Sequence, residues 1–414
     1  MKNLPEFRQH IAKPAFLSII LKVTERCNLA CPYCYFFFSG DESYKEHPPF
    51  VSGATVDQLV EFIRRAVRDN GIGQVRIGLH GGEPLLLKPD KFAAMCEQLR
   101  SALDPLCDLM LVVQTNGVLV NPEWVELFGR FNVRIGVSID GDEAVHNIFR
   151  ITKKGKGTYA ETRRGWHLLN DAMASRTIPS ATILCVVSPQ QDGGKILRHF
   201  AEELRATGLN FLLPDVTHDS PEATARFIDG CGDFLVDMFD AWADLSRRKV
   251  KVTVRWIDEI IGAMLNDELC RRSANAKFEP LWQFVVSSNG EISPDDVIRG
   301  LDPRFRTFAF NVADSPYEEV QASPVWQELD QAQHRLPAAC QGCEWKHLCH
   351  GGPYQHRYCA ANGFDNPSVY CRSLKRFFAH VADRVASSGY PREQIARRLA
   401  TDWTQQKEHH AAPD

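Results

Sequence analysis

Three cysteines near the amino terminus have a spacing that suits metal chemistry. Cys27, Cys31 and Cys34 follow one another as C-x3-C-x2-C directly after an apolar run. Three thiolates on one short loop suit an iron–sulfur cluster in which one iron has no protein ligand, and such an iron can bind a substrate or a cofactor. Zinc is the alternative occupant, and it would need a fourth ligand, for which His47 is the nearest candidate.

A second group of cysteines lies near the other end of the chain. Cys340, Cys343 and Cys349 form C-x2-C-x5-C, and Cys371 follows 22 residues later. Four thiolates would close the coordination shell of an iron–sulfur cluster, which leaves electron transfer or a structural role rather than substrate activation. Cys359 competes for the place of the fourth ligand, and a zinc ribbon is the alternative for this spacing alone.

The composition favours metal ligation over disulfides. The chain has 414 residues and 13 cysteines, and its amino terminus interleaves charge and proline where a secretory signal would be apolar. Its longest apolar runs are too short to cross a bilayer. We therefore expect a cytoplasmic protein with reduced cysteines and no membrane partner. With 48 basic against 52 acidic residues there is no broad basic field, so we expect no nucleic-acid partner.

The cysteine loops need secondary-structure elements that position them. From residue 16 to about residue 213, short apolar runs alternate with stretches of helical periodicity, the pattern of repeated βα units with a parallel sheet. Six such units are too few for an eight-unit barrel, so the sequence predicts an α/β fold with a partial, open (β/α)6 barrel. The six expected strands are 16–23, 74–80, 109–115, 133–139, 181–187 and 209–214.

The second half of the chain has a different pattern. Helical periodicity predicts a connector, and residues 282–296 predict a strand, an Asn-Gly turn and a second strand ahead of a loop-rich segment with the late cysteines. The expected organisation is an amino-terminal segment 1–15, the barrel 16–220, a helical connector 221–278, an α+β domain for the second cysteine group 279–385 and a tail 386–414.

The first cysteine loop resembles the signature of the radical S-adenosylmethionine (radical SAM) superfamily. In that family C-x3-C-x-aromatic-C follows the first strand of a partial (β/α) barrel, and Tyr33 is the aromatic residue here. The resemblance implies that Cys27, Cys31 and Cys34 hold a [4Fe–4S] cluster whose open iron binds S-adenosylmethionine. Reductive cleavage of this cofactor would give a 5′-deoxyadenosyl radical that removes a hydrogen atom from the substrate.

Further motifs at the ends of the following strands extend this resemblance. In the family, the glycines of Gly-Gly-Glu-Pro let the backbone approach the cofactor and the Glu receives its amino group. Ser138 and Asp140 resemble contacts to the ribose or carboxylate of the cofactor. Arg150 ends a stretch similar to His-Asp-x-x-Arg, with Asn147 in place of Asp, and either clamps a carboxylate or lies at the surface. The cofactor-binding residues implied are Tyr33, Gly81, Gly82, Glu83, Ser138, Asp140 and Arg150.

The late cysteines resemble the SPASM extension of radical SAM enzymes that modify peptides. There, C-x2-C-x5-C-x3-C and further cysteines help to carry two auxiliary clusters. This chain has Pro353 at the x3 position, and the upstream Gly-x4-Cys becomes Gly290-x4-Asp295. In members with two auxiliary clusters, the cysteines at these two positions serve the first of them. Because this chain lacks both cysteines, the resemblance implies one auxiliary [4Fe–4S] cluster. Its ligands would be Cys340, Cys343, Cys349 and Cys371.

Two features bear on the reaction. Asp296 corresponds to an Asp that acts as a base in the anaerobic sulfatase-maturating relatives, with Asp295 as a competitor. Residues 350–358 resemble a GG-x3-His-Arg-Tyr segment in maturases that form three-residue cyclophanes, where His356 and Arg357 either bind the peptide or orient the cluster loop. We therefore expect a radical SAM oxidoreductase that joins an aromatic ring to a Cβ atom of a peptide.

The resemblance also implies partners and alternatives. The substrate would be a ribosomally synthesised precursor peptide, and the reducing electron would come from a donor such as flavodoxin or ferredoxin. The single auxiliary cluster would accept the electron released when the ring regains aromaticity. The alternatives are thioether formation, epimerisation or sulfatase maturation by the same cofactors, or a non-catalytic iron–sulfur or zinc protein.

Overall fold

The computed structural model describes residues 16–276, 283–306 and 308–401. The expected segment 1–15, the expected boundary at 278/279 and the last part of the tail, 402–414, lie outside the described residues. None of the described helices is both long and apolar enough to cross a membrane.

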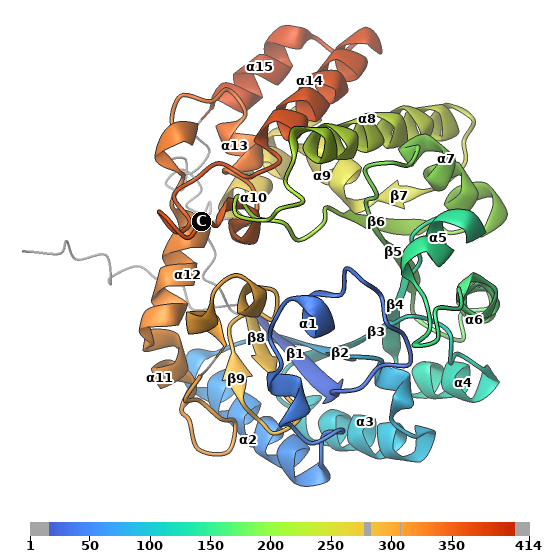
Figure 1. Ribbon diagram of the computed structural model, residues 1–414, viewed down its shortest axis with the longest axis vertical. Coiled ribbons are helices and arrows are strands. Elements are labelled where there is room, and N and C mark those ends of the chain that lie inside the picture. The colour runs from blue at the N-terminus through green and yellow to red at the C-terminus, as the bar shows by residue number, and fades with distance from the viewer. Residues whose placement is uncertain (1–15, 277–282, 307, 402–414) are drawn as a thin grey trace, which may run out of the picture.

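One sheet organises the described chain, with the strand order β7-β6-β5-β4-β3-β2-β1-β8-β9 (Figure 1). Strands β1 to β8 pair in parallel with their neighbours, whereas β9 is antiparallel to β8. The six expected strands and the open, partial barrel are confirmed. The strands are β1 (Phe16–Thr24), β2 (Gln74–Gly81), β3 (Asp108–Thr115), β4 (Val133–Ser138), β5 (Ala181–Val186), β6 (Gly208–Leu212), β7 (Thr253–Val254), β8 (Gln283–Val286) and β9 (Ile292–Ser293).

Helices between the strands cover the outer face of the sheet (Figure 1). The first of the long ones begins where the Ser52 hydroxyl accepts a hydrogen bond from the Thr55 backbone N–H, and it ends at Gly71 in the left-handed conformation. Its buried face carries large apolar side chains such as Phe62. The helices are α2 (Gly53–Asn70), α3 (Pro89–Leu103), α4 (Pro122–Arg130), α5 (Glu143–Phe149), α6 (Tyr159–Ala174) and α7 (Gly193–Arg198).

The region after the sixth strand is helical, as the periodicity predicts. It contains α8 (Ala225–Arg247), α9 (Arg255–Leu265) and α10 (Asp267–Ala276), with the short strand β7 between the first two. The hairpin β8–β9 that comes next is also as expected. Its pairing with β1 was not foreseen, and it makes this segment an extension of the barrel sheet.

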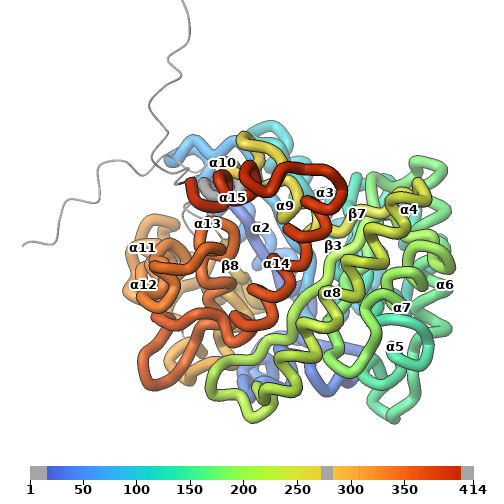
Figure 2. Tube along the Cα trace, turned by 90° about the horizontal axis from the view of Figure 1, so that it is seen from above, coloured from blue at the N-terminus to red at the C-terminus, as the bar shows by residue number. Residues whose placement is uncertain are grey.

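The carboxyl-terminal part contains more helix than the expected loop-rich segment. Its longest helix, α14, begins at Cys371 and packs along α8, as Figure 2 also shows. A second, smaller core lies in this part, around Ile298, Phe305 and Phe364. The helices are α11 (Tyr317–Ala322), α12 (Pro324–His334), α13 (Lys346–Cys349), α14 (Cys371–Ser387) and α15 (Arg392–Ala400).

Candidate active site and cluster-binding cysteines

The first cysteine loop joins β1 to the short helix α1 (Tyr35–Phe38). Cys27, Cys31 and Cys34 are free, partly buried thiols. Burial raises the pKa of Cys27 to about 12 and that of Cys31 to about 11. Thiols in such a setting become thiolates only when a cation compensates the charge, which is the condition that cluster iron supplies. The loop therefore fits the expected iron–sulfur cluster.

Gly81 and Gly82 allow the end of β2 to pack against the backbone that leads into this loop. A Cβ atom on Gly81, whose φ is +119°, would lie 2.1 Å from the Thr24 carbonyl oxygen, and one on Gly82 would lie 2.1 Å from the Arg26 carbonyl oxygen. The Gly82 N–H donates to the Thr24 carbonyl at 2.9 Å. The glycines thus have a steric role in holding the cysteine loop, in addition to the expected approach to a cofactor, which stays a prediction.

Glu83 is completely buried at the end of the same motif. Its carboxylate accepts hydrogen bonds from the Thr115 hydroxyl at 2.7 Å, the Asn116 backbone N–H at 2.7 Å and the Leu85 backbone N–H at 3.1 Å. Burial raises its pKa to about 7, although these hydrogen bonds oppose the rise. Thr115 and Asn116, at the end of β3, therefore hold Glu83, and a cationic amino group would stabilise the charged carboxylate.

Tyr33, Asp140 and Arg150 form a network beside the cysteines. Asp140 accepts hydrogen bonds from the Tyr33 hydroxyl, from the Val186 backbone N–H at 3.1 Å and from Arg150 Nε at 2.8 Å and Nη2 at 3.2 Å. Arg150 is buried, so its alternative as a surface residue is wrong. The Ser138 hydroxyl accepts a hydrogen bond from Gln114, so direct cofactor contacts by Ser138 and Asp140 stay predictions.

Asp296 lies in a buried ion pair. Its carboxylate contacts the Lys22 ammonium group, whose side chain is only 1% exposed, and accepts a hydrogen bond from the Tyr35 hydroxyl at 2.9 Å. Burial raises the pKa of Asp296, but the Lys22 charge outweighs that effect and the pKa is lowered to about 2. Asp296 is therefore ionised at neutral pH, and its hydrogen-bond donor Tyr35 is the residue next to Cys34.

Asp295 has the opposite electrostatic setting. Its carboxyl group accepts hydrogen bonds from the Tyr354 hydroxyl and from the Val297 backbone N–H at 2.8 Å. Burial and the neighbouring Asp296 charge raise its pKa to about 7. Tyr354 follows Pro353, so this hydrogen bond links Asp295, one position where a cysteine was expected and is absent, to the neighbour of the other.

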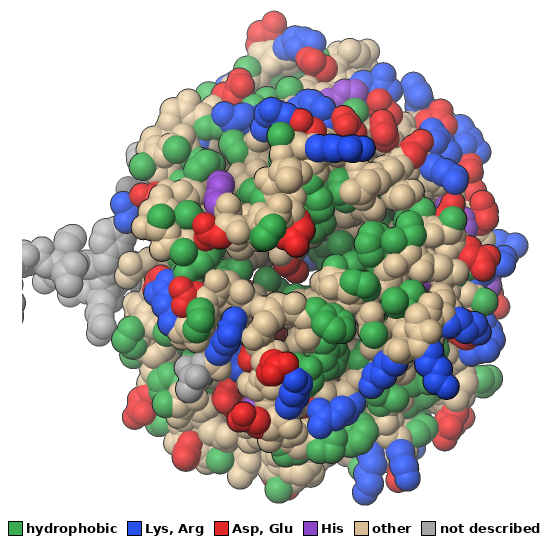
Figure 3. All heavy atoms as spheres, in the orientation of Figure 1, with side chains coloured by type: hydrophobic (Ala, Val, Ile, Leu, Met, Phe, Trp, Pro, Cys, Tyr) green, Lys and Arg blue, Asp and Glu red, His purple; other side chains and the backbone are tan. Residues whose placement is uncertain are grey.

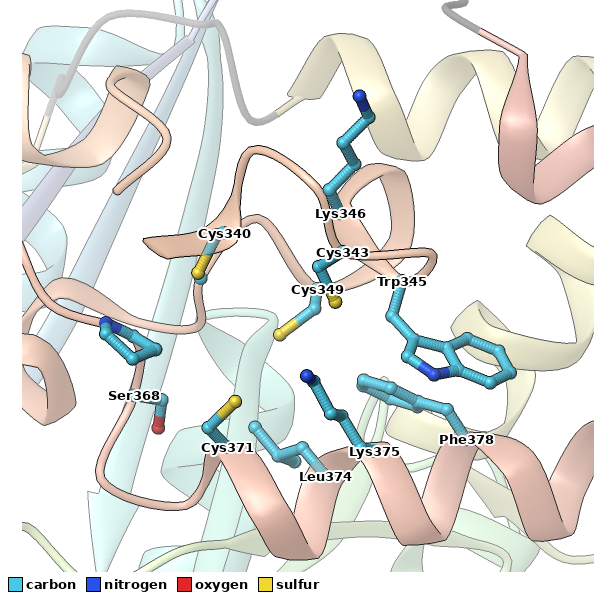
Figure 4. A pocket seen from close by; sticks show the side chains of 12 residues that line it. Cys340, Cys343, Trp345, Lys346, Cys349, Ser368, Cys371, Leu374, Lys375 and Phe378 are labelled. Atoms are coloured by element: carbon cyan, nitrogen blue, oxygen red, sulfur yellow. The ribbon is translucent and has the colours of Figure 1, made fainter. Parts of the chain in front are cut away.

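Cys340, Cys343, Cys349 and Cys371 line one hollow, which we call the four-cysteine hollow (Figure 4). They come from three elements: the chain around residue 340, α13 and the first residue of α14. Figure 4 shows their sulfur atoms directed toward a common space. Cys359 is not among the residues that line it, and its thiol donates to Asp219 at 3.4 Å instead. The geometry therefore favours Cys371 over Cys359 as the fourth ligand.

Arg357 lies close enough to Cys340 and Cys349 for its charge to act on them. Its side chain is 2% exposed and donates from Nε and Nη2 to the Phe364 carbonyl and from Nη2 to the Arg335 carbonyl. Of its two expected roles, orienting the cluster loop is the one these hydrogen bonds favour. In the part of the chain that the structure describes, no group of at least three His, Cys, Asp or Glu side chains is arranged to hold a single metal ion.

Sequence reasoning missed Lys22 and Tyr35. A signal for Lys22 was available, because a lysine inside the apolar run at 16–23 of an expected interior strand must find a buried partner. No comparable signal marked Tyr35. Figure 3 shows a hollow near the centre of the molecule, bordered by hydrophobic and acidic side chains, which is not the four-cysteine hollow; α1 lies beside this centre in Figure 1.

Comparison with known proteins agrees with this geometry. Residues 21–199 match the model of the radical SAM superfamily. The chain is 25% identical over 375 residues to the cysteine-type anaerobic sulfatase-maturating enzyme of Clostridium perfringens (strain 13 / Type A), covering 89% of this chain and 97% of that protein. It is 26% identical over 407 residues to the serine-type enzyme of Bacteroides thetaiotaomicron, covering 90% of each.

Solved structures share the fold. The structure of native anSMEcpe with bound AdoMet and Cp18Cys peptide matches with a TM-score of 0.75 at 22% identity, over 90% of this chain and 98% of that one. SuiB of Streptococcus suis bound to S-adenosylmethionine matches with a TM-score of 0.53 at 15% identity, over 83% and 72%. The expected radical SAM fold is confirmed: the protein is an enzyme that carries a radical SAM domain over residues 21–199.

Proposed function

We propose that this enzyme removes a hydrogen atom from a Cβ atom of a peptide or protein substrate and that Asp296 accepts the proton released when the product forms. The observation that carries this proposal is the position of Asp296. Its carboxylate is hydrogen-bonded by Tyr35, the residue that follows Cys34, so an ionised base stands beside the cysteine loop.

The cysteines and their surroundings fit the cofactors that this chemistry needs. Cys27, Cys31 and Cys34 would hold a [4Fe–4S] cluster that binds S-adenosylmethionine, with the Glu83 carboxylate placed for the amino group of that cofactor. The four cysteines of the four-cysteine hollow would hold one auxiliary [4Fe–4S] cluster. When bound, these groups supply a 5′-deoxyadenosyl radical for hydrogen abstraction and an acceptor for the electron that the substrate releases.

Asp296 is better suited than Asp295 to take the proton. The ion pair with Lys22 keeps Asp296 ionised, whereas burial and the Asp296 charge raise the pKa of Asp295 to about 7. A carboxylate of low pKa is a weak base, but it suffices for a strongly acidic proton such as one on an oxidised ring. Asp295 then remains at least partly protonated at neutral pH.

For the product, we propose a crosslink between an aromatic ring and a Cβ atom within a ribosomally synthesised precursor peptide. The peptide loses two hydrogens: one leaves Cβ as a hydrogen atom, and the other leaves the ring as a proton, which goes to Asp296, and an electron. The resemblance of residues 350–358 to cyclophane-forming maturases supports this product. The reaction releases one electron from the ring, so a single auxiliary cluster would suffice as its acceptor. A donor such as flavodoxin or ferredoxin would supply the reducing electron.

Sulfatase maturation is the second candidate. The relatives named as cysteine-type and serine-type anaerobic sulfatase-maturating enzymes align over about nine-tenths of the chain, which favours it. Oxidation of a cysteine or serine side chain also begins with removal of a Cβ hydrogen. The two candidates therefore share the hydrogen abstraction and differ in the fate of the carbon radical that it leaves.

The test uses the enzyme reconstituted with iron and sulfide, for which about eight irons per chain fit two four-iron clusters. It is incubated with S-adenosylmethionine, a reductant and either its encoded precursor peptide or a sulfatase-derived peptide, each deuterated at Cβ. Deuterium in 5′-deoxyadenosine supports the shared step. Fragmentation that locates a ring-to-Cβ bond supports the crosslink, whereas a product that reacts with an aldehyde-trapping hydrazine supports sulfatase maturation. Absence of deuterium transfer from both peptides would overturn the proposal.

A further inference from the structure

A lysine lies at the edge of the four-cysteine hollow. Lys375 is four residues after Cys371, so it is one turn further along α14 and on the same face. It is among the residues that line the hollow. Figure 4 shows the side chain running from the helix into the space that the four thiols share, with the amine group directed toward the sulfur atoms. Lys375 lies close enough to Cys340 and Cys371 for its charge to act on them.

The other lysine that lines the hollow behaves differently. Lys346 belongs to α13, and Figure 4 shows its amine group pointing away from the sulfur atoms. Its ammonium group donates a hydrogen bond to the Gln341 carbonyl at 3.3 Å. Two lysines therefore border the same hollow, and only the amine of Lys375 is directed at the sulfurs.

A positive charge in this place has a defined effect on an iron–sulfur cluster. Nearby net charge and hydrogen bonds to the sulfurs are among the factors that set the reduction potential of such clusters. Reduction adds one negative charge to a cluster that four thiolates already make anionic. An ammonium group beside the thiolates stabilises the reduced form more than the oxidised form, and so raises the potential.

We propose that Lys375 raises the reduction potential of the auxiliary cluster and thereby makes it a better acceptor for the electron that leaves the substrate. This inference rests on the proposed function, since it requires an iron–sulfur cluster at the four cysteines. The electron balance is that of the proposed reaction: the substrate loses one electron and one proton, the cluster gains the electron and Asp296 gains the proton.

The test measures the midpoint potential of the auxiliary cluster by anaerobic redox titration, followed by electron paramagnetic resonance. The full chain with Cys27, Cys31 and Cys34 replaced by alanine provides the background, so that only the auxiliary cluster is present. Lys375→Met is compared with Lys375→Arg, which keeps the charge, and with Lys346→Met, the matched control. Iron and sulfide are counted in every variant.

We expect Lys375→Met to shift the one-electron equilibrium about tenfold toward the oxidised cluster, which is about 59 mV. Lys375→Arg and Lys346→Met should stay close to the parent. Equal potentials in all variants with about four irons retained per chain would overturn the role of Lys375 alone. Absence of iron from the parent chain would overturn the auxiliary cluster and, with it, this inference.

Discussion

Replacing Lys22 tests whether the buried ion pair holds Asp296 ionised. Both side chains are almost fully buried, and Lys22→Met removes the positive charge with little change in volume. The lowering of the Asp296 pKa from 3.8 to about 2 corresponds to about 2–3 kcal/mol, at about 1.36 kcal/mol for each pKa unit. Removing one partner of a buried pair typically costs about 3–5 kcal/mol. We expect Lys22→Met to destabilise the protein by about 3 kcal/mol at pH 7.

The pH dependence distinguishes lost electrostatics from lost packing. In the parent, the contribution of Asp296 is complete above about pH 4 and is lost as the pH falls through about 2, because the folded-state pKa is the lower one. In Lys22→Met, burial raises the Asp296 pKa, so the variant recovers stability relative to the parent as Asp296 binds a proton. The destabilisation should therefore shrink by about 1 kcal/mol or more between pH 7 and pH 5.

The assay is anaerobic urea unfolding of the reconstituted protein at both pH values. The double variant Lys22→Met with Asp296→Asn should regain at least half of the lost stability, because no uncompensated buried charge remains. Lys45→Met is the control, since Lys45 pairs with Glu42 at the exposed surface, where such pairs contribute about 0–1 kcal/mol. A Lys22→Met effect that is the same at both pH values, and that Asp296→Asn does not relieve, would refute the reasoning.

Three further predictions concern the residues around the cysteine loop. Gly82→Ala should prevent assembly of the first cluster and lower the iron content to about four per chain. Gly73→Ala is the control and should keep about eight irons, because its Cβ meets no atom within 4 Å. Equal iron contents in the two variants would contradict the steric role of Gly82. S-adenosylmethionine binding, measured by calorimetry, should strengthen as the pH rises through about 7, because Glu83 loses its proton. Glu83→Gln should remove that pH dependence. The same pH dependence of binding in Glu83→Gln and the parent would contradict the role of Glu83. Asp296→Asn should still form 5′-deoxyadenosine, but the yield of modified peptide, quantified by mass spectrometry, should fall about 100-fold. Asp295→Asn should retain the parent yield. A large loss of yield in Asp295→Asn and none in Asp296→Asn would make Asp295 the base.

The sequence predicted the barrel well because its signals are local. Each expected strand is a short apolar run followed by a helical period, and the structure has all six. The pairing of β8 with β1 could not be predicted in this way, since it joins segments about 265 residues apart and depends on the closure of the sheet edge. Helix α14 did carry a local signal: Leu374, Phe377 and Val381 recur at helical spacing after the cysteine.

In the candidate site too, residues in local motifs could be predicted and contacts between distant segments could not. The cysteine loops and Glu83 belong to compact motifs, so their residues could be named from the cysteine spacing together with the resemblance to the radical SAM and SPASM motifs. The partners that set their chemistry come from distant segments: Lys22 reaches Asp296 from β1, and Tyr33 reaches Asp140 from the cysteine loop. Such contacts depend on the three-dimensional packing, and a single sequence contains no periodicity that reports them.

The place of Cys371 follows from packing rather than from charge. Arg372 and Arg376 of α14 pair with Asp229 and Asp233 of α8, but these pairs are largely exposed and each contributes little. The apolar contact between α14 and α8 is stronger than these ion pairs, because Phe377 is completely buried and meets Phe239 of α8 edge-on at 6.2 Å between ring centroids. A helix fixed along the barrel in this way holds its first residue at a set position. Cys371, the proposed fourth ligand, is therefore held in place through the packing of α14 on α8. Since α8 follows β6 of the barrel, the position of the proposed electron acceptor depends on the packing of the barrel.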